Sequence, residues 1–257
     1  MRIREVEFGN IDVKTLTPEL VTKFLEEHMK QLMALPGNQP QYEPANQPEI
    51  ADSPLRGKKV IFLGSSVVLG QAALNTSFVE LLAHTDGLEV IKEAVNGTSM
   101  VDLDGMGLSY IKRVKTIAKD FAPDLFVMQL STNDATQGFP LGQISESKNR
   151  DDFDTLTVTG AMEYLFSYIE ETFKCPLLVF TGTQFLHPQY EQMVERLHEL
   201  KEKWDLNILD LWHDEEMNAT SDEDYDLYMN DPIHPTKAGY SLWWGPKFRT
   251  CITELLK

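Results

Sequence analysis

Apolar and polar residues along most of the chain alternate in blocks that favour strands and helices in turn. The apolar run at 60–64 is typical of a strand buried on both faces, and further strands are predicted at 88–95, 125–130, 176–180 and 206–211. Apolar residues at helical spacing occur between and after these strands, at 72–84, 109–120, 155–173, 189–204 and 237–256. Strands that alternate with helices of this length predict a parallel sheet with helices on both faces. We therefore expect a three-layer α/β/α sandwich with a central parallel sheet of about five strands.

Residues 1–55 follow a different pattern and are expected to form an arm on a domain at 56–257. A helix is predicted to begin at Thr17-Pro18, because proline suits the first turn of a helix. Its apolar face comprises Leu20, Val21, Phe24, Leu25, Met29, Leu32 and Met33. The prolines between residues 36 and 48 predict an extended strap without regular structure. Such an apolar face favours docking, either on the domain itself or on a second copy in a homodimer.

Composition and charge narrow the classes of partner. With 23 basic and 40 acidic residues, the chain has a net charge of −17, which opposes binding to nucleic acid and to anionic membranes. The N-terminus lacks the pattern of a signal peptide, and no apolar run has membrane-spanning length. Cys175 and Cys251 lack metal-ligand spacing and predict reduced thiols rather than a disulfide. We expect a cytoplasmic protein with no nucleic-acid or membrane partner.

Polar residues follow three successive predicted strands. Gly64-Ser65-Ser66 follows the first strand, Gly97 follows the second, and Asn133 follows the third. Because the carboxyl ends of parallel strands lie side by side, these residues should meet at one edge of the sheet, where such sheets bind ligands. A hydroxyl on a tight strand-to-helix turn suits a nucleophile, and Ser66 is the candidate. The alternative is that the serine only caps the following helix.

Asp231 and His234 lie three residues apart in a turn with flanking prolines. In this arrangement the carboxylate can accept from one imidazole nitrogen while the other nitrogen faces outward, as a general base requires. The alternatives are that His234 is a satisfied core histidine, that Asp231 caps the last helix, and that Asn133 is a turn residue. The acidic stretch at 214–226 is interpreted as a solvated loop, with a lid beside His234 as the alternative. The remaining histidines show no ligand spacing and are interpreted as structural: His28, His84, His187, His198 and His213.

Taken in this order, the motifs resemble those of the SGNH (GDSL-like) hydrolases. The resemblance rests on Gly64-Ser65-Ser66, Gly97, Asn133-Asp134 and Asp231-Pro232-Ile233-His234-Pro235, and it covers 58–256. It implies an SGNH/flavodoxin-like fold and a serine hydrolase that needs no metal and no cofactor. By the same resemblance Ser66 is the nucleophile and His234 is the base, oriented by Asp231. The oxyanion hole would combine the backbone N–H groups of Ser66 and Gly97 with the side-chain amide of Asn133.

Two positions depart from the family's usual pattern. Ser65 stands where the family has an aspartate, and Ser131 stands where a glycine usually precedes the asparagine by two residues. We expect altered hydrogen bonding at Ser65 and a narrower acyl pocket beside Ser131. The predicted function is hydrolysis of short, acetyl-like esters of a soluble, carbohydrate-type alcohol. The alternatives are a lysophospholipase or thioesterase, which would need a long apolar groove, and a non-enzymatic binding protein that retains the fold.

Overall fold

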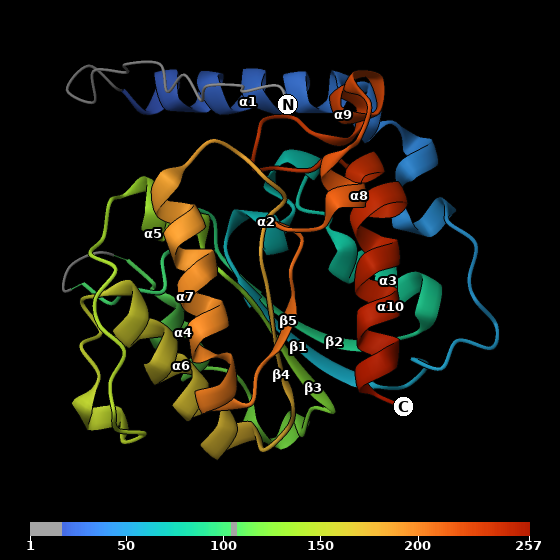
Figure 1. Ribbon diagram of the computed structural model, residues 1–257. Coiled ribbons are helices and arrows are strands. Elements are labelled where there is room, and N and C mark those ends of the chain that lie inside the picture. Colours follow the sequence, from blue (N-terminus) through green and yellow to red (C-terminus); the bar gives the residue numbers. More distant parts are fainter. Residues whose placement is uncertain (1–16, 104–106) are drawn as a thin grey trace.

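The computed structural model describes residues 17–103 and 107–257, in which five strands form a parallel sheet (Figure 1). The strands are β1 (Lys59–Gly64), β2 (Glu89–Ala94), β3 (Leu125–Gln129), β4 (Leu177–Phe180) and β5 (Asn207–Leu209). Their order is β2-β1-β3-β4-β5, and every neighbouring pair is parallel. This is the strand order of flavodoxin-like sheets. The predicted three-layer fold with a sheet of about five strands is confirmed.

Helices cover both faces of the sheet and build a hydrophobic core on each. On one face, Val60 and Phe62 of β1 pack with α3 (Phe78–Asp86) and α10 (Gly245–Leu255). On the other face, Ile61 and Leu63 pack with α4 (Tyr110–Val114), α6 (Val158–Phe173) and α7 (Pro188–Trp204). Successive side chains of a strand point to opposite faces, so a central strand with two covered faces is apolar throughout. This explains the apolar runs of the inner strands β1, β3 and β4, whereas the edge strand β2 carries Glu89, Lys92 and Glu93.

The helix predicted at 72–84 is wrong in its first half. A short helix, α2 (Ser66–Leu69), begins at Ser66 and ends at Gly70, which has a φ of 80°. Leu74 and Asn75 then take positive φ values of 59° and 63°. Because a helix cannot continue through left-handed residues, the chain turns before α3 begins behind its capping residue Ser77.

The acidic stretch at 214–226 is not a loop, because two helices, α8 (Glu215–Asn218) and α9 (Asp222–Tyr228), occupy most of it. The Asp214 side chain accepts a hydrogen bond from the backbone N–H of Met217 at 3.0 Å, and Ser221 caps α9 in the same way. Acidic side chains in the first turn also favour a helix by lying near its positive end. The remaining short elements are η5 (Gln71–Ala73), η6 (Lys119–Phe121), α5 (Thr132–Thr136), η7 (Arg150–Asp152) and the π-helical turn η8 (Gly239–Trp244).

The strap expected to be extended instead forms three consecutive 3₁₀ turns. They are η2 (Pro36–Asn38), η3 (Pro40–Tyr42) and η4 (Pro44–Asn46), and each begins at a proline. The ring of proline fixes φ near the helical value, and the N–H that it lacks is not needed at the first position of a turn. A repeated proline therefore sets a repeated turn here rather than excluding one.

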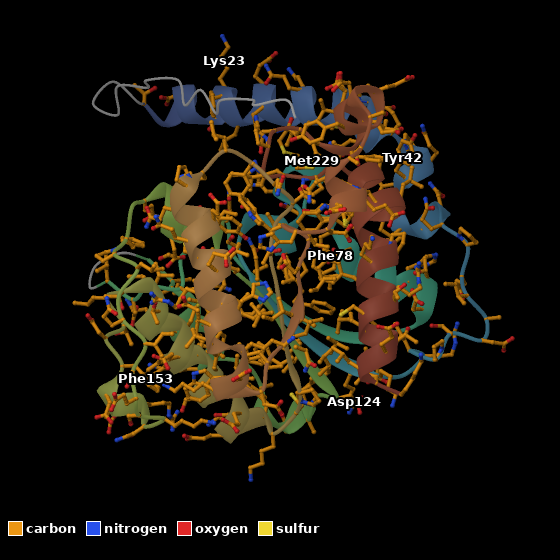
Figure 2. All side chains as sticks on the ribbon, in the orientation of Figure 1. Lys23, Tyr42, Phe78, Asp124, Phe153 and Met229 are labelled. Atoms are coloured by element: carbon orange, nitrogen blue, oxygen red, sulfur yellow. The ribbon has the colours of Figure 1, made fainter. Side chains whose placement is uncertain are left out.

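Helix α1 (Pro18–Ala34) confirms the predicted helix and lies across the carboxyl edge of the sheet (Figure 1). Figure 2 shows Lys23 pointing away from the domain, and Asp124, which precedes β3, at the opposite end of the sheet. Of the predicted apolar face, Leu32 is buried, whereas the exposed fractions of Phe24, Leu25, Met29 and Met33 range from 44% to 60%. The side chains of Leu20 and Val21, and all of residues 1–16, lie outside the described residues. Among the members of this face whose side chains the structure describes, only Leu32 is buried against the domain.

Two expectations from composition concern the cysteines and membrane-spanning segments. Cys175 and Cys251 are both free, as expected, and burial raises the pKa of each thiol to about 11. Within the described ranges, no single helix is long and apolar enough to cross a membrane. Ser66–Ala73 and Phe78–Asp86 would reach that length and composition only as a pair, and they meet at 90°.

Candidate active site

Ser66 follows the first strand at a turn that requires glycine before it. A Cβ at Gly64, the last residue of β1, would lie 2.2 Å from Val68 Cγ2, so only glycine lets the chain turn this tightly. As the first residue of α2, Ser66 has a backbone N–H with no acceptor inside that helix. The residue is only 3% exposed. The serine hydroxyl is therefore held at the carboxyl edge of the sheet with little open space around it.

The structure brings Ser66, His234 and Asp231 together in one chain of hydrogen bonds. His234 Nε2 lies 2.8 Å from Ser66 Oγ, and His234 Nδ1 lies 2.8 Å from Asp231 Oδ2. Asp231 Oδ1 accepts from the backbone N–H groups of Ile233 at 2.9 Å and His234 at 3.0 Å. Asn230 Nδ2 donates to Asp231 Oδ2 at 3.1 Å. The turn that carries the histidine thus fixes its own carboxylate.

The charge on Asp231 determines which ring nitrogen of His234 carries the proton. Burial raises the pKa of Asp231, but the hydrogen bond and charge of His234 and the two backbone N–H groups lower it below its usual value. The carboxylate is therefore ionised at neutral pH and accepts a hydrogen bond from the N–H at Nδ1. A neutral imidazole with its proton on Nδ1 leaves Nε2 as an acceptor for the hydroxyl of Ser66.

The two other predicted site residues meet in the loop after β2. Asn133 begins the first turn of α5, and its Nδ2 donates to the backbone carbonyl of Thr98 at 2.9 Å. Thr98 follows Gly97, which has a φ of 72° and nothing within 4 Å of the position of a Cβ. The structure therefore places Asn133 beside the loop of Gly97, as the order of the strands predicted. In the described part of the chain, neither residue is hydrogen-bonded to Ser66.

Asp134 holds this loop from beneath. Its carboxylate is fully buried and accepts from the backbone N–H groups of Met100 at 2.8 Å and Val101 at 3.0 Å. Burial raises the pKa of Asp134 to about 6, against the lowering effect of the hydrogen bonds that it accepts. In the sequence Asp134 stood out only as the residue beside Asn133. A charged residue soon after a buried strand was nevertheless a signal of a role in the site.

Arg113 is a residue of the site that sequence reasoning missed. Its side chain is 3% exposed and donates from Nη2 to the carbonyl of Gly64 at 2.7 Å and to Thr98 Oγ1 at 2.9 Å. Nη1 donates to the carbonyl of Glu93 at 2.9 Å. One guanidinium thus joins the end of β1, which precedes Ser66, to the end of β2 and the loop behind it. A basic residue on an amphipathic helix normally faces solvent, so the sequence offered no sign of this role.

Ser65, the departure from the family's aspartate, is paired with the end of β3. Gln129 Oε1 accepts from the backbone N–H of Ser65 at 2.9 Å and from its hydroxyl at 3.4 Å. The Nε2 of Gln129 is buried without a hydrogen-bond partner among the described residues. Gln129 also lines a cavity of about 10 Å³, whose wall includes the residue that follows Ser66, Val67, and the one that precedes His234, Ile233. This space holds about one water molecule.

A larger cavity of about 220 Å³ lies beside the small one. The two share Thr183 and Phe185 in their walls. Tyr225 of α9 and Trp243 also line the larger cavity. Trp243 stacks on Tyr228 with ring centroids 5.6 Å apart, so its ring is fixed. The second space thus offers a firm aromatic wall.

The strap that follows α1 contacts both halves of this site. Asn38 Nδ2 donates to the carbonyl of Ala72 at 2.7 Å, on the segment that follows Ser66. Asn38 Oδ1 accepts from the backbone N–H of Lys237 at 3.0 Å, three residues after His234. The Lys237 ammonium in turn forms an ion pair with Glu43 of the strap. We call the Asn38 side chain, together with the Ala72 carbonyl and the Lys237 N–H to which it bonds, the Asn38 clamp.

Comparison with known proteins places this geometry in a wider group. The sequence matches the GDSL-like Lipase/Acylhydrolase family over residues 62–242. No curated protein sequence matched the chain.

Several solved structures share the fold. A Lactobacillus plantarum protein has a TM-score of 0.60 at 18% identity, with 78% of this chain and 97% of that chain covered. A candidate GDSL-like lipase from Bacteroides ovatus has a TM-score of 0.59 at 14% identity, with 77% and 99% covered. A family two carbohydrate esterase from Clostridium thermocellum, solved with cellohexaose, has a TM-score of 0.53 at 14% identity, with 80% and 66% covered.

Identities this low establish a common fold, whereas the family match covers well over half of the chain. The matched range includes Ser66, Gly97 and Asn133 as well as Asp231 and His234. The chain therefore belongs to the GDSL-like lipase/acylhydrolase family.

Proposed function

We propose that this protein is a serine esterase that removes short, acetyl-like groups from a soluble, carbohydrate-type alcohol. Membership of the family makes it a hydrolase that acts on esters. The observation that carries the finer proposal is the chain from Asp231 through His234 to Ser66, with both imidazole nitrogens at 2.8 Å from their partners. An orienting carboxylate, a base and a nucleophile in this sequence are what acyl transfer by a serine requires.

Ser66 and His234 would act together in the first half of the reaction. Ser66 Oγ attacks the carbonyl carbon of the ester while His234 Nε2 takes the proton of the hydroxyl. The new C–O bond pushes an electron pair onto the carbonyl oxygen, which becomes an oxyanion. When that pair returns, the bond to the alcohol breaks, and the leaving oxygen takes the proton from Nε2. Asp231 stays ionised and stabilises the imidazolium.

Water would complete the reaction in the second half. His234 Nε2 takes a proton from a water molecule, whose oxygen attacks the acyl carbon. The bond to Ser66 Oγ then breaks, and the serine recovers its proton from Nε2. The free acid leaves, and the three side chains return to their starting protonation states. No group beyond the ester and water is consumed.

The backbone N–H of Ser66 and the loop of Gly97 with Asn133 would stabilise the oxyanion. The N–H of Ser66 has no acceptor within α2, and Asn133 retains one amide hydrogen beyond the one given to Thr98. Hydrogen-bond donors held in place before the charge develops lower the barrier without reorganising during the reaction. Arg113 and Asp134 support this by fixing the loop from below.

A short acyl group is supported by the space beside the serine. The cavity that borders Val67 and Ile233 measures about 10 Å³, and Ser66 is 3% exposed. A methyl group needs about as much room as one water molecule, whereas a long chain would have to displace core side chains. Ser131, which was expected to narrow the acyl pocket, is buried and donates to the carbonyl of Thr98 at 3.4 Å, and it does not line this cavity.

A carbohydrate-type alcohol is supported by the larger cavity with Trp243 and Tyr225 in its wall. Flat aromatic rings with nearby polar groups give an apolar contact surface and orientation together. The solved carbohydrate esterase from Clostridium thermocellum shows that this fold can carry such an activity.

The proposal is tested with p-nitrophenyl esters of increasing acyl length and with Ser66→Ala. We expect acetate and butyrate to be hydrolysed faster than octanoate and longer esters. The alanine variant should remain folded by circular dichroism and lose several powers of ten in turnover, on the order of 10⁶. An organophosphate should label Ser66 in the wild-type protein, as located by peptide mass spectrometry.

Three outcomes would contradict the proposal. Fastest turnover of long-chain esters or lysophospholipids would favour the lipid hydrolase or thioesterase. Labelling at another serine would remove the role of Ser66. A folded wild-type protein with no activity on any ester would favour a binding protein that retains the fold.

A further inference from the structure

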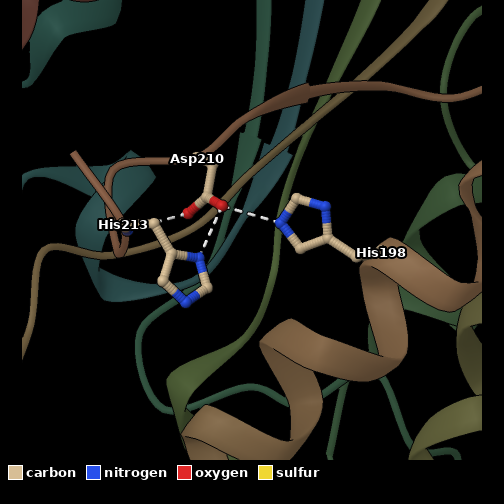
Figure 3. Close-up of side chains that lie close together, drawn as sticks. All are labelled: His198, Asp210 and His213. Carbon is tan, nitrogen blue, oxygen red and sulfur yellow. Dashed lines mark hydrogen bonds and ion pairs between the residues drawn. The ribbon is translucent and has the colours of Figure 1, made fainter.

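A second cluster of ionisable side chains lies at the edge of the sheet beside β5 (Figure 3). Asp210 follows β5, His213 lies three residues later, and His198 comes from the middle of α7. Helix α7 leads into β5 through a short turn, so its middle lies beside the carboxyl end of that strand. The two histidines are far apart in the sequence, so their spacing gave no sign of this cluster. Both were therefore interpreted as structural.

Two imidazole nitrogens converge on one carboxylate oxygen. His198 Nε2 lies 2.7 Å and His213 Nδ1 lies 2.8 Å from Asp210 Oδ2 (Figure 3). The other oxygen, Oδ1, accepts from the backbone N–H of His213 at 3.1 Å and from Thr181 Oγ1 at 3.4 Å. The carboxylate is therefore oriented by one oxygen and leaves the second for the two rings.

The spacing of the three ligand atoms is close to that of a metal site. All three lie within 4.8 Å of one another. Ligand atoms around a tetrahedral zinc ion, at about 2.0–2.1 Å from the metal, are roughly 3.3 Å apart. Small rotations of the two rings, each partly exposed, would admit the ion in place of the two imidazole protons that now point at Asp210.

Glu195 supplies the outer partner that metal-bound histidines usually have. Its Oε1 lies 3.5 Å from His213 Nε2, the ring nitrogen that faces away from Asp210. A carboxylate on the second nitrogen fixes the tautomer of a ligating histidine and raises its basicity. With His213 ligating through Nδ1, the proton would sit on Nε2 and donate to Glu195. The carboxylates of Asp210 and Glu195 together balance the charge of a divalent ion.

We propose that His198, Asp210 and His213 bind a zinc ion, with a fourth position open to water. Two imidazoles and one carboxylate form a donor set that zinc takes up in proteins. The side chains are 36%, 20% and 47% exposed, respectively, so an ion can enter from solvent. The net charge of −17 favours the approach of a cation. The ion would join α7 to the segment that carries Trp212, whose ring packs on Phe185 in the wall of both cavities.

The experiment measures zinc binding directly and does not use esterase activity. The whole protein is stripped with a chelator, dialysed, and titrated with zinc chloride in a calorimeter at neutral pH. We expect one zinc ion per chain with a dissociation constant in the micromolar range or below. His198→Ala, His213→Ala and Asp210→Asn should each weaken binding at least 100-fold. His84→Ala is the matched control, because His84 bonds only to the carbonyl of Gln47 at 3.2 Å and should bind zinc as the wild type does.

Glu195→Gln gives an independent readout that does not disturb the ligands. Loss of an outer carboxylate typically reduces metal affinity 10- to 100-fold, so this variant should bind zinc more weakly by about that factor. Saturating cobalt in place of zinc should give the visible absorption of a four-coordinate site in the wild type, the His84 variant and Glu195→Gln, but not in the three ligand variants. Weak binding without a defined stoichiometry, equal in all variants, would overturn the proposal and assign the ions to the acidic surface. Stoichiometric binding that survives the three ligand substitutions would overturn it equally.

Discussion

Asn38 Oδ1 accepts a hydrogen bond from the backbone N–H of Lys237 at 3.0 Å, and this contact links the N-terminal strap to the segment that carries His234. The same carboxamide donates to the carbonyl of Ala72, on the segment that follows Ser66. Asn38 therefore bridges the segments that carry Ser66 and His234 from outside both of their turns, together with the Tyr240 hydroxyl, which donates to the carbonyl of Val67 at 2.6 Å. Asn38 is 4% exposed, and its loss would leave buried backbone groups without partners.

We expect Asn38→Ala to lower kcat about 10- to 100-fold with little change in KM. A misplacement of about 1 Å between nucleophile and base is enough for a loss of this size. The free energy of unfolding should also fall by about 1–3 kcal/mol, because a buried N–H and a buried carbonyl lose their partner. Kinetics on p-nitrophenyl acetate and urea unfolding measure the two effects.

Asn38→Asp is the companion variant. A carboxylate can still accept from Lys237 but cannot donate to Ala72, so it should recover only part of kcat. An unchanged kcat in the alanine variant, with lower stability, would reduce the Asn38 clamp to a packing contact.

Asp231→Asn is expected to reduce kcat by about 10⁴, as the equivalent change does in a studied triad. An amide would donate to Nδ1 of His234 and would place the remaining ring proton on Nε2, where it faces Ser66. Kinetics on p-nitrophenyl acetate measure the loss, and circular dichroism checks that the variant is folded. An unchanged kcat in a folded variant would contradict the role of Asp231 in orienting His234.

Asn133→Ala should lower kcat about 10²–10³-fold, which is the loss expected for one oxyanion donor. Its bond to Thr98 is also lost, so the melting temperature must be compared with that of the wild type. Thr136→Ala, on the same short helix with its hydroxyl bonded to the carbonyl of Asn133 at 3.3 Å, is the control. Equal kcat in the two variants would return Asn133 to a turn role.

Asp134 should make the protein less stable as the pH rises from about 4 to about 6. The pKa of its carboxyl is raised from 3.8 to about 6 in the folded chain, so the folded state binds this proton more tightly than the unfolded state. Its contribution to the free energy of unfolding is then present at low pH and falls by about 3 kcal/mol as the group ionises.

Urea unfolding of wild type and Asp134→Asn over pH 4–7 isolates this contribution by difference. The pKa of Asp231 is lowered, so its contribution has the opposite sign and is lost as the pH falls below about 4, outside this window. A difference between the two proteins that does not vary with pH would contradict the burial-raised pKa of Asp134.

The exposed apolar side chains of α1 predict a homodimer through the arm. Phe24, Leu25, Met29 and Met33 are at least 44% exposed on the same helix, and a second copy of the chain is the commonest cover for such a face. Sedimentation of the whole chain should give a dimer mass, and Leu25→Glu with Met29→Glu should give a monomer. Lys23→Glu, on the side that points away from the domain, is the control. A monomeric wild type at tens of micromolar would refute the prediction.

The inner strands β1, β3 and β4 could be predicted from the sequence because burial on both faces makes them apolar throughout. β1, for example, is apolar from Val60 to Leu63, and that pattern alone defines it. The segment after Ser66 was mispredicted because its apolar residues suit a helix, whereas the left-handed backbone at Leu74 and Asn75 interrupts it. Leu74 carries no local sign of this conformation, whereas Asn75 and the capping box of Ser77 and Glu80 were signals of a break before α3.

The residues of the candidate site also fall into those that the sequence revealed and those that it did not. Ser66, Asp231 and His234 stood out because the nucleophile lies on a strand-to-helix turn and the other two lie in one short turn. Arg113 and Asn38 did not, because both bond mainly to backbone carbonyls and N–H groups of distant segments. Arg113 reaches Gly64 across 49 residues of chain. Backbone groups carry no sequence signal, so such contacts become visible only in the folded chain.

The Asn38 clamp also has a consequence for the order in which the molecule assembles. Asn38 and Lys237 are 199 residues apart, so the strap is synthesised long before its partner exists. Closing so long a loop is costly until the intervening elements have folded and brought the ends together. We therefore expect the sheet and its helices to form before the strap docks on them. The strap, although it is synthesised early, is then among the last segments to take its final position, and the enzyme reaches its full kcat only when Asn38 bridges the two halves of the site.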